Sequence, residues 1–66
     1  GLNEAAVGAV QKAGTDWELL TLYYGSDITV NEAQRAAAEL EKLCPGAEVP
    51  VLEGAPPLYP LIITLE

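Results

Sequence analysis

Few side chains in this chain can do acid–base or nucleophilic chemistry. Its 66 residues include no histidine, one cysteine (Cys44) and three basic residues, Lys12, Arg35 and Lys42. Without histidine, neither a Ser/His/Asp triad nor the usual metal site can be built, and one thiol makes no thiolate cluster. We therefore expect no catalytic residue, no metal ligand and no bound cofactor within these residues.

The remaining reactive positions have simpler interpretations. Cys44 falls at the end of a predicted helix, where the negative end of the dipole disfavours a thiolate, so we interpret it as a small buried or half-buried apolar residue. Glu39 and Glu41 are two apart on that helix and point away from each other. Gly25 lacks the further glycines and the lysine of a phosphate-binding loop, so it indicates a turn.

Three tyrosines are better candidates for binding than for chemistry. Neighbours on a strand face opposite sides, so one of Tyr23 and Tyr24 faces the core and the other faces outward, and the sequence leaves open which. A surface tyrosine near a turn is a good interface anchor. Because loops and strand ends concentrate function, our candidate interface residues are Tyr24, Asp27, Gly54 and Tyr59.

Composition restricts the partners and the compartment. The formal net charge is −7, and Lys and Arg are not clustered, which disfavours nucleic acid and anionic membrane surfaces. No apolar run approaches the ~20 residues that span a bilayer, so we expect no membrane insertion. One cysteine gives no internal disulfide, which makes the cytoplasm the expected location.

We predict one domain over residues 1–66, with a leading helix in 1–14 and a strand–helix–strand–strand unit in 17–66. The Ala-rich stretch from Asn3 to Ala13 reads as a helix that Asn3 caps and Gly14 ends. The nearly continuous apolar run from Trp17 to Tyr24 is typical of a central strand covered on both faces, or nearly so.

The second helix has the strongest local signal. Thr29 and Glu32 have the spacing of a capping box, and Ile28 stands where a hydrophobic staple begins. Apolar residues then recur at helical spacing until Pro45, which together with the following glycine ends the helix.

Two further strands are predicted over Ala47–Leu52 and Leu58–Leu65, joined by a loop at 53–57. The fold class is therefore α/β, a small two-layer sandwich with a mixed three-stranded sheet, the first two strands parallel through a right-handed crossover and the third antiparallel. Pro50 and Pro60 favour edge positions, hence the order two-one-three. The short loop favours a hairpin and the order one-three-two, and the sequence leaves both orders open.

The residues from Trp17 to Glu66 resemble the C-terminal end of a bacterial family, that of the A subunit of fatty acid kinase, also described as dihydroxyacetone-kinase-like or DAK-domain proteins. The family pattern of a strand ending in Tyr-Tyr-Gly, an acidic helix and a final turn and strand matches Tyr23-Tyr24-Gly25, Asp27, Thr29 to Leu43, Gly54, Pro57, Leu58, Tyr59 and Glu66. The sequence departs from the family at Ala55 and Pro56, where Gly and Gln are usual.

The resemblance implies a modular cytoplasmic protein with an N-terminal kinase domain that binds ATP and magnesium, a middle domain and a C-terminal domain. The chain begins at Gly1 rather than at Met, and we interpret it as that C-terminal domain. The resemblance implies a non-catalytic module that docks the fatty-acid-binding partner subunit or packs on the parent's middle domain. The alternative is a purely structural segment that completes a larger α/β sheet, and such a segment would associate through an exposed edge.

Overall fold

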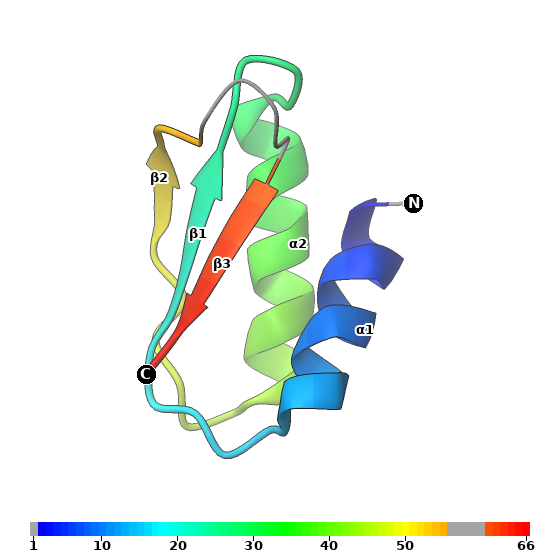
Figure 1. Ribbon diagram of the computed structural model, residues 1–66, viewed down its shortest axis with the longest axis vertical. Helices are drawn as coiled ribbons and strands as arrows, with labels where there is room; N and C mark the ends of the chain where they lie inside the picture. Colours follow the sequence, from blue (N-terminus) through cyan, green and yellow to red (C-terminus); the bar gives the residue numbers. More distant parts are fainter. Residues whose placement is uncertain (1, 56–60) are drawn as a thin grey trace.

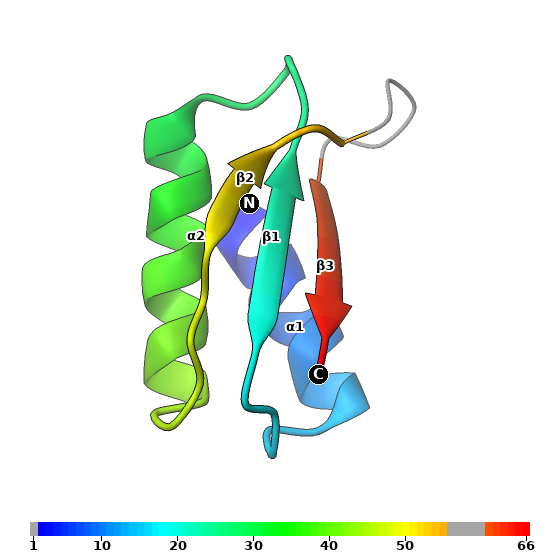
Figure 2. The same cartoon turned by 90° about the vertical axis from the view of Figure 1, so that its left-hand side faces the viewer.

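The computed structural model describes residues 2–55 and 61–66 as two helices packed on one face of a three-stranded sheet (Figures 1 and 2). In chain order the elements are α1 (Leu2–Ala13), β1 (Leu20–Tyr24), α2 (Val30–Leu43), β2 (Val51–Glu53) and β3 (Leu61–Leu65). This order, with its two layers and mixed sheet, confirms the predicted α/β sandwich.

The strand order is β2-β1-β3, with β1 parallel to β2 and antiparallel to β3. The order two-one-three is therefore correct, and the rival order, which places β3 between β1 and β2, is wrong. The hydrogen bonds of β1 show the arrangement, because the Leu22 N–H donates to the Pro50 carbonyl at 2.9 Å on one side while Leu19 exchanges backbone hydrogen bonds with Glu66 on the other. Pro60 lies outside the described residues.

Both strands of the parallel pair are shorter than the sequence suggests. The predicted strand from Trp17 begins at Leu20, although Leu19 already bridges Glu48 and exchanges backbone hydrogen bonds with Glu66. The Trp17 indole N–H instead donates to the carbonyl of Gly14 at 2.9 Å. The second strand is Val51–Glu53 rather than Ala47–Leu52, although the Glu48 carbonyl still accepts from Leu20 at 2.8 Å. The missing N–H of the intervening proline interrupts the regular pairing.

The final strand begins at Leu61, and the rest of its predicted range, residues 58–60, falls outside the described part of the chain. The predicted loop at 53–57 is described only as far as Ala55, and Glu53 belongs to β2.

The helix ends follow local chemistry closely in α2 and less closely in α1. The Thr29 hydroxyl accepts from the Glu32 N–H at 3.2 Å, and the Glu32 carboxylate accepts from the Thr29 N–H at 3.3 Å, which completes the predicted capping box. Gly14 follows α1 with φ 107°, a conformation that favours glycine. Asn3, predicted to cap α1, instead lies inside the helix, which begins at Leu2.

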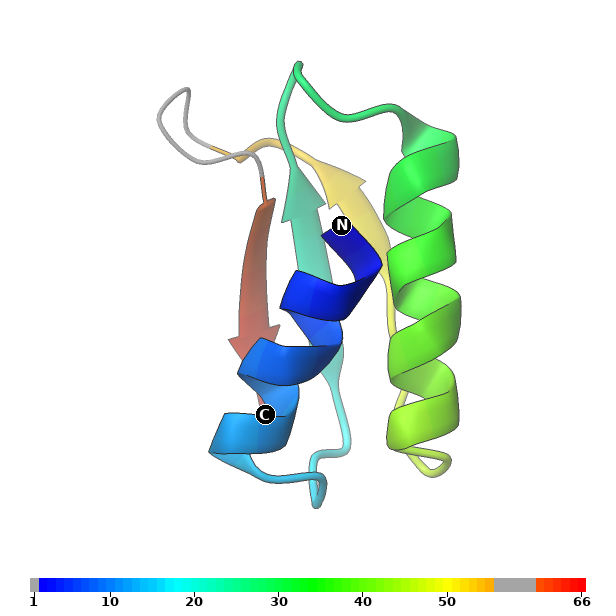
Figure 3. The ribbon, with the colours of Figure 1, turned by 90° about the vertical axis from the view of Figure 1, so that its right-hand side faces the viewer.

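The core lies between the helices and the sheet (Figure 3). Leu20, Leu22 and Leu40 are completely buried, and Val10 and Cys44 are almost so. Alanines complete this interior: Ala6 of α1, and Ala33, Ala36 and Ala37 of α2. Small side chains let α1 and α2 lie close together, but they bury little apolar surface each. The core is therefore well closed yet small.

Replacing Leu40 by Ala should remove most of the stability of the domain. Truncating a buried leucine costs ~2–5 kcal/mol, which is comparable with the ~3–5 kcal/mol net that a core of this size supplies. We expect a largely unfolded Leu40→Ala chain at room temperature, measured by circular dichroism during urea titration. Val30→Ala is the matched control, because Val30 is 46% exposed, and it should leave the urea midpoint nearly unchanged.

Loss of the cap at α2 should have a smaller, graded effect. Thr29→Ala removes the hydroxyl that accepts from the Glu32 N–H, and we expect a loss of ~0.5–2 kcal/mol in the free energy of unfolding. Thr29→Ser keeps the acceptor and should retain most of the stability. Equal urea midpoints for both variants would show that the capping box contributes nothing.

Candidate docking surfaces

The chain has no histidine, and its one cysteine lies in the core. No group of three or more Cys, Asp or Glu side chains among them can hold a metal ion. Cys44 is 1% exposed, which confirms its interpretation as a buried apolar residue. Glu39 forms an exposed ion pair with Lys42 at 3.8 Å. The functional candidates are therefore surfaces.

The first surface, which we name the loop end, consists of Tyr24, Asp27 and Gly54. The N–H groups of Gly54 and Ala55 donate to the Tyr24 carbonyl at 3.0 and 3.3 Å, which fastens the end of β2 to the end of β1. Asp27 is exposed in the turn that follows β1, at the same end of the molecule (Figure 1). The structure thus brings three of the four predicted interface residues to one end, while Tyr59 lies outside the described residues.

The strand register decides between the two neighbouring tyrosines. Leu20 and Leu22 are buried against the helices, so Tyr24, two residues further on, faces the same side. Tyr23 faces the opposite side, where it pairs with Leu52 of β2 and Ile62 of β3. Both rings are half-buried. Tyr23 is therefore the tyrosine that faces outward.

The second surface is the open face of the sheet, formed by Tyr23, Leu52, Ile62 and Thr64, with Thr21 on the same side but only 7% exposed. Paired residues of neighbouring strands share a face, and no described helix lies on this one (Figure 2). Leu52 is 47% exposed. Sequence reasoning missed this surface, because it read the apolar run of β1 as covered on both sides. The available signal was the alternation before β2 and within it, which puts Val49 and Val51 on one face of the strand and Leu52 on the opposite face.

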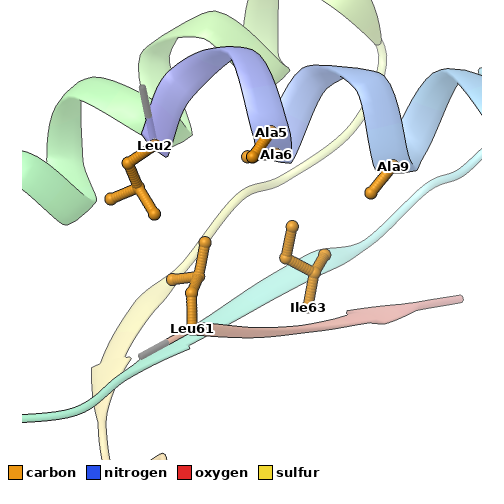
Figure 4. A pocket seen from close by; sticks show the side chains of 6 residues that line it. All are labelled: Leu2, Ala5, Ala6, Ala9, Leu61 and Ile63. Carbon is orange, nitrogen blue, oxygen red and sulfur yellow. The ribbon is translucent and has the colours of Figure 1, made fainter. Parts of the chain in front are cut away.

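A third feature is an apolar groove between α1 and β3 that encloses about 350 Å³. Leu2, Ala5 and Ala9 point from α1 toward Leu61 and Ile63 of β3 (Figure 4). None of these side chains can ionise or donate a hydrogen bond. The groove therefore has nothing with which to orient a polar ligand.

Together the elements define a small α/β sandwich of two helices on a mixed three-stranded sheet. Residues 2–66 match the model of the FakA-like C-terminal family, the C-terminal region of proteins like the A subunit of fatty acid kinase, and the chain belongs to this family. The resemblance inferred from the sequence is therefore confirmed. No curated protein and no solved structure matches the chain. No helix among the described residues is long and apolar enough to cross a membrane.

The loop end requires glycine at position 54. Gly54 has φ 145°, a conformation that side chains rarely adopt, although nothing within 4 Å would obstruct a methyl group there. We expect Gly54→Ala to cost ~1–3 kcal/mol of unfolding free energy through backbone strain alone. Gly46→Ala is the matched control, because Gly46 also has open space around it and no positive φ. Equal urea midpoints for the two variants would contradict this prediction.

Proposed function

We propose that this chain, as part of a fatty acid kinase, is a non-catalytic docking module and that its loop end binds the fatty-acid-binding partner subunit. The observation that carries the proposal is the convergence of Tyr24, Asp27 and Gly54 at one end of the sheet, within a chain of this family. Exposed loop residues held by a rigid sheet are a common basis for recognition.

The charge of the loop end indicates what the partner presents. Residues 24–29 and 51–55 contain Asp27 and Glu53 but no Lys or Arg. An acidic rim attracts a basic surface, mainly by raising the association rate. We therefore propose that the partner subunit contributes a basic patch next to an apolar pocket for Tyr24. Binding should weaken as salt concentration rises.

The open sheet face supports a second role, packing against the parent's middle domain. Its apolar side chains, Tyr23, Leu52 and Ile62, form one surface across all three strands. In this role the chain completes a larger α/β structure, and the sheet gains a covering layer on its second face. The two roles use different surfaces and are compatible.

The kinase chemistry belongs, in this proposal, to other parts of the parent chain in the bacterial cytoplasm. ATP and magnesium do not fit the described residues, which lack a glycine-rich loop, a basic cluster and a group of metal-binding carboxylates. We propose that both bind in the N-terminal domain. The module then contributes the placement of the acyl-carrying partner rather than a reacting group.

Titration calorimetry of the chain with the fatty-acid-binding subunit tests the docking role. We expect saturable binding that Tyr24→Ala weakens by roughly tenfold or more, as truncation of an interface anchor does. Asp27→Asn should weaken binding less and should reduce its salt dependence. Glu41→Gln is the matched control, because it removes one exposed carboxylate at the far end of α2 and should leave binding unchanged.

Two other results would reject the loop end as the contact. Binding that survives Tyr24→Ala and Asp27→Asn but is lost in Leu52→Lys would move the contact to the open sheet face. A folded chain that shows no heat of binding would leave packing on the parent as its role. Circular dichroism of each variant separates lost contacts from lost folding.

A further inference from the structure

No strand among residues 2–55 and 61–66 pairs with the outer edge of β3, and the backbone groups on that edge follow a regular pattern. Leu19 and Glu66 exchange both of their backbone hydrogen bonds, at 2.9 Å each, so the antiparallel ladder alternates from that pair onward. The backbone groups of Ile62 and Thr64 therefore point toward β1. Those of Leu61, Ile63 and Leu65 point away from the sheet.

This edge lacks the devices that usually prevent strand pairing. Protected edges carry proline, lysine or other charges, whereas Leu61–Leu65 is a five-residue run of apolar and β-branched side chains. The opposite edge differs in length and charge, because β2 has only three residues and includes Glu53, whereas Pro60 and Glu66 flank β3 without belonging to it. An edge of the β3 kind is a template for another strand.

We propose that β3 pairs with β3 of a second copy of this chain, antiparallel and about a two-fold axis at Ile63. In this register Ile63 meets Ile63, and Leu61 meets Leu65 of the other copy. These are the residues whose N–H and C=O groups point outward, so every outward group of one strand meets a complementary group of the other. The result is one continuous sheet through both copies.

The groove between α1 and β3 fits the same partner. Leu61 and Ile63 line it, and the copy's own Leu61, Ile63 and Leu65 extend the helix-facing side of the sheet beside it. Ala5 and Ala9 are exposed and lie on the side of α1 that faces this groove, which leaves their methyl groups open to the copy.

Charge also favours a second copy at this position over other parts of the surface. Two chains of net charge −7 repel, but neither Leu61–Leu65 nor the lining of the groove carries an ionisable side chain. The antiparallel register places the two Glu66 side chains at opposite ends of the paired strands. No like charges meet, and salt should strengthen association because it screens the remaining repulsion.

Sedimentation equilibrium of the chain from about 10 µM to about 1 mM tests this proposal. We expect the mass to rise from 7.0 kDa toward twice that value. N-methylation of the Ile63 amide, introduced by chemical ligation at Cys44, removes an outward N–H and should hold the mass at that of the monomer. N-methylation of Val51 is the matched control, because its N–H points outward from the β2 edge, and the dimer should persist.

Hydrogen exchange provides a readout that does not depend on a variant. The amides of Leu61, Ile63 and Leu65 should gain protection as the concentration of the unmodified chain rises. A mass that stays at 7.0 kDa throughout, or dimers that survive methylation of Ile63, would overturn the proposal. Loss of the dimer in Leu52→Lys would assign association to the open face instead. This test uses the chain alone, so failure of the dimer can be distinguished from failure of the proposed docking to the fatty-acid-binding subunit.

Discussion

The structure depends on the position of β1 between the other two strands and beneath the helices. Leu20 and Leu22 are completely buried, and the backbone of β1 exchanges hydrogen bonds with β2 on one side and β3 on the other. Both edge strands pair only with β1, and Val51, Leu61 and Ile63 on them pack against the same core. A change that displaced β1 would separate the parallel pair, the antiparallel pair and the helix layer together.

A domain this small leaves much apolar surface at its boundary. The interior contains many alanines, so the few leucines contribute most of the buried area, while Leu52, Tyr23 and Ile62 remain on a face that no described helix covers. Such a distribution is typical of a module that functions in contact with other protein. The loop end, the open face and the β3 edge are the three separate surfaces that we propose for such contact.

Local signals in the sequence predicted the elements and part of the candidate site. The spacing of Thr29 and Glu32 defined the start of α2, and Gly14 marked the end of α1, because caps and turns depend on neighbours within a few residues. The interface residues near turns could be chosen for the same reason. The open face could not be predicted in this way, because segments distant in the sequence decide whether the second side of β1 is covered.

The sequence by itself determined that this is an α/β module of a known family with no histidine, one buried cysteine and no reactive cluster. Only the tertiary structure decided the strand order, the outward direction of Tyr23 and the free edge of β3. The physical reason is the separation along the sequence of the residues that interact. Helix caps and side-chain alternation depend on near neighbours, whereas the choice of strand neighbours depends on which distant backbone groups and apolar faces satisfy each other.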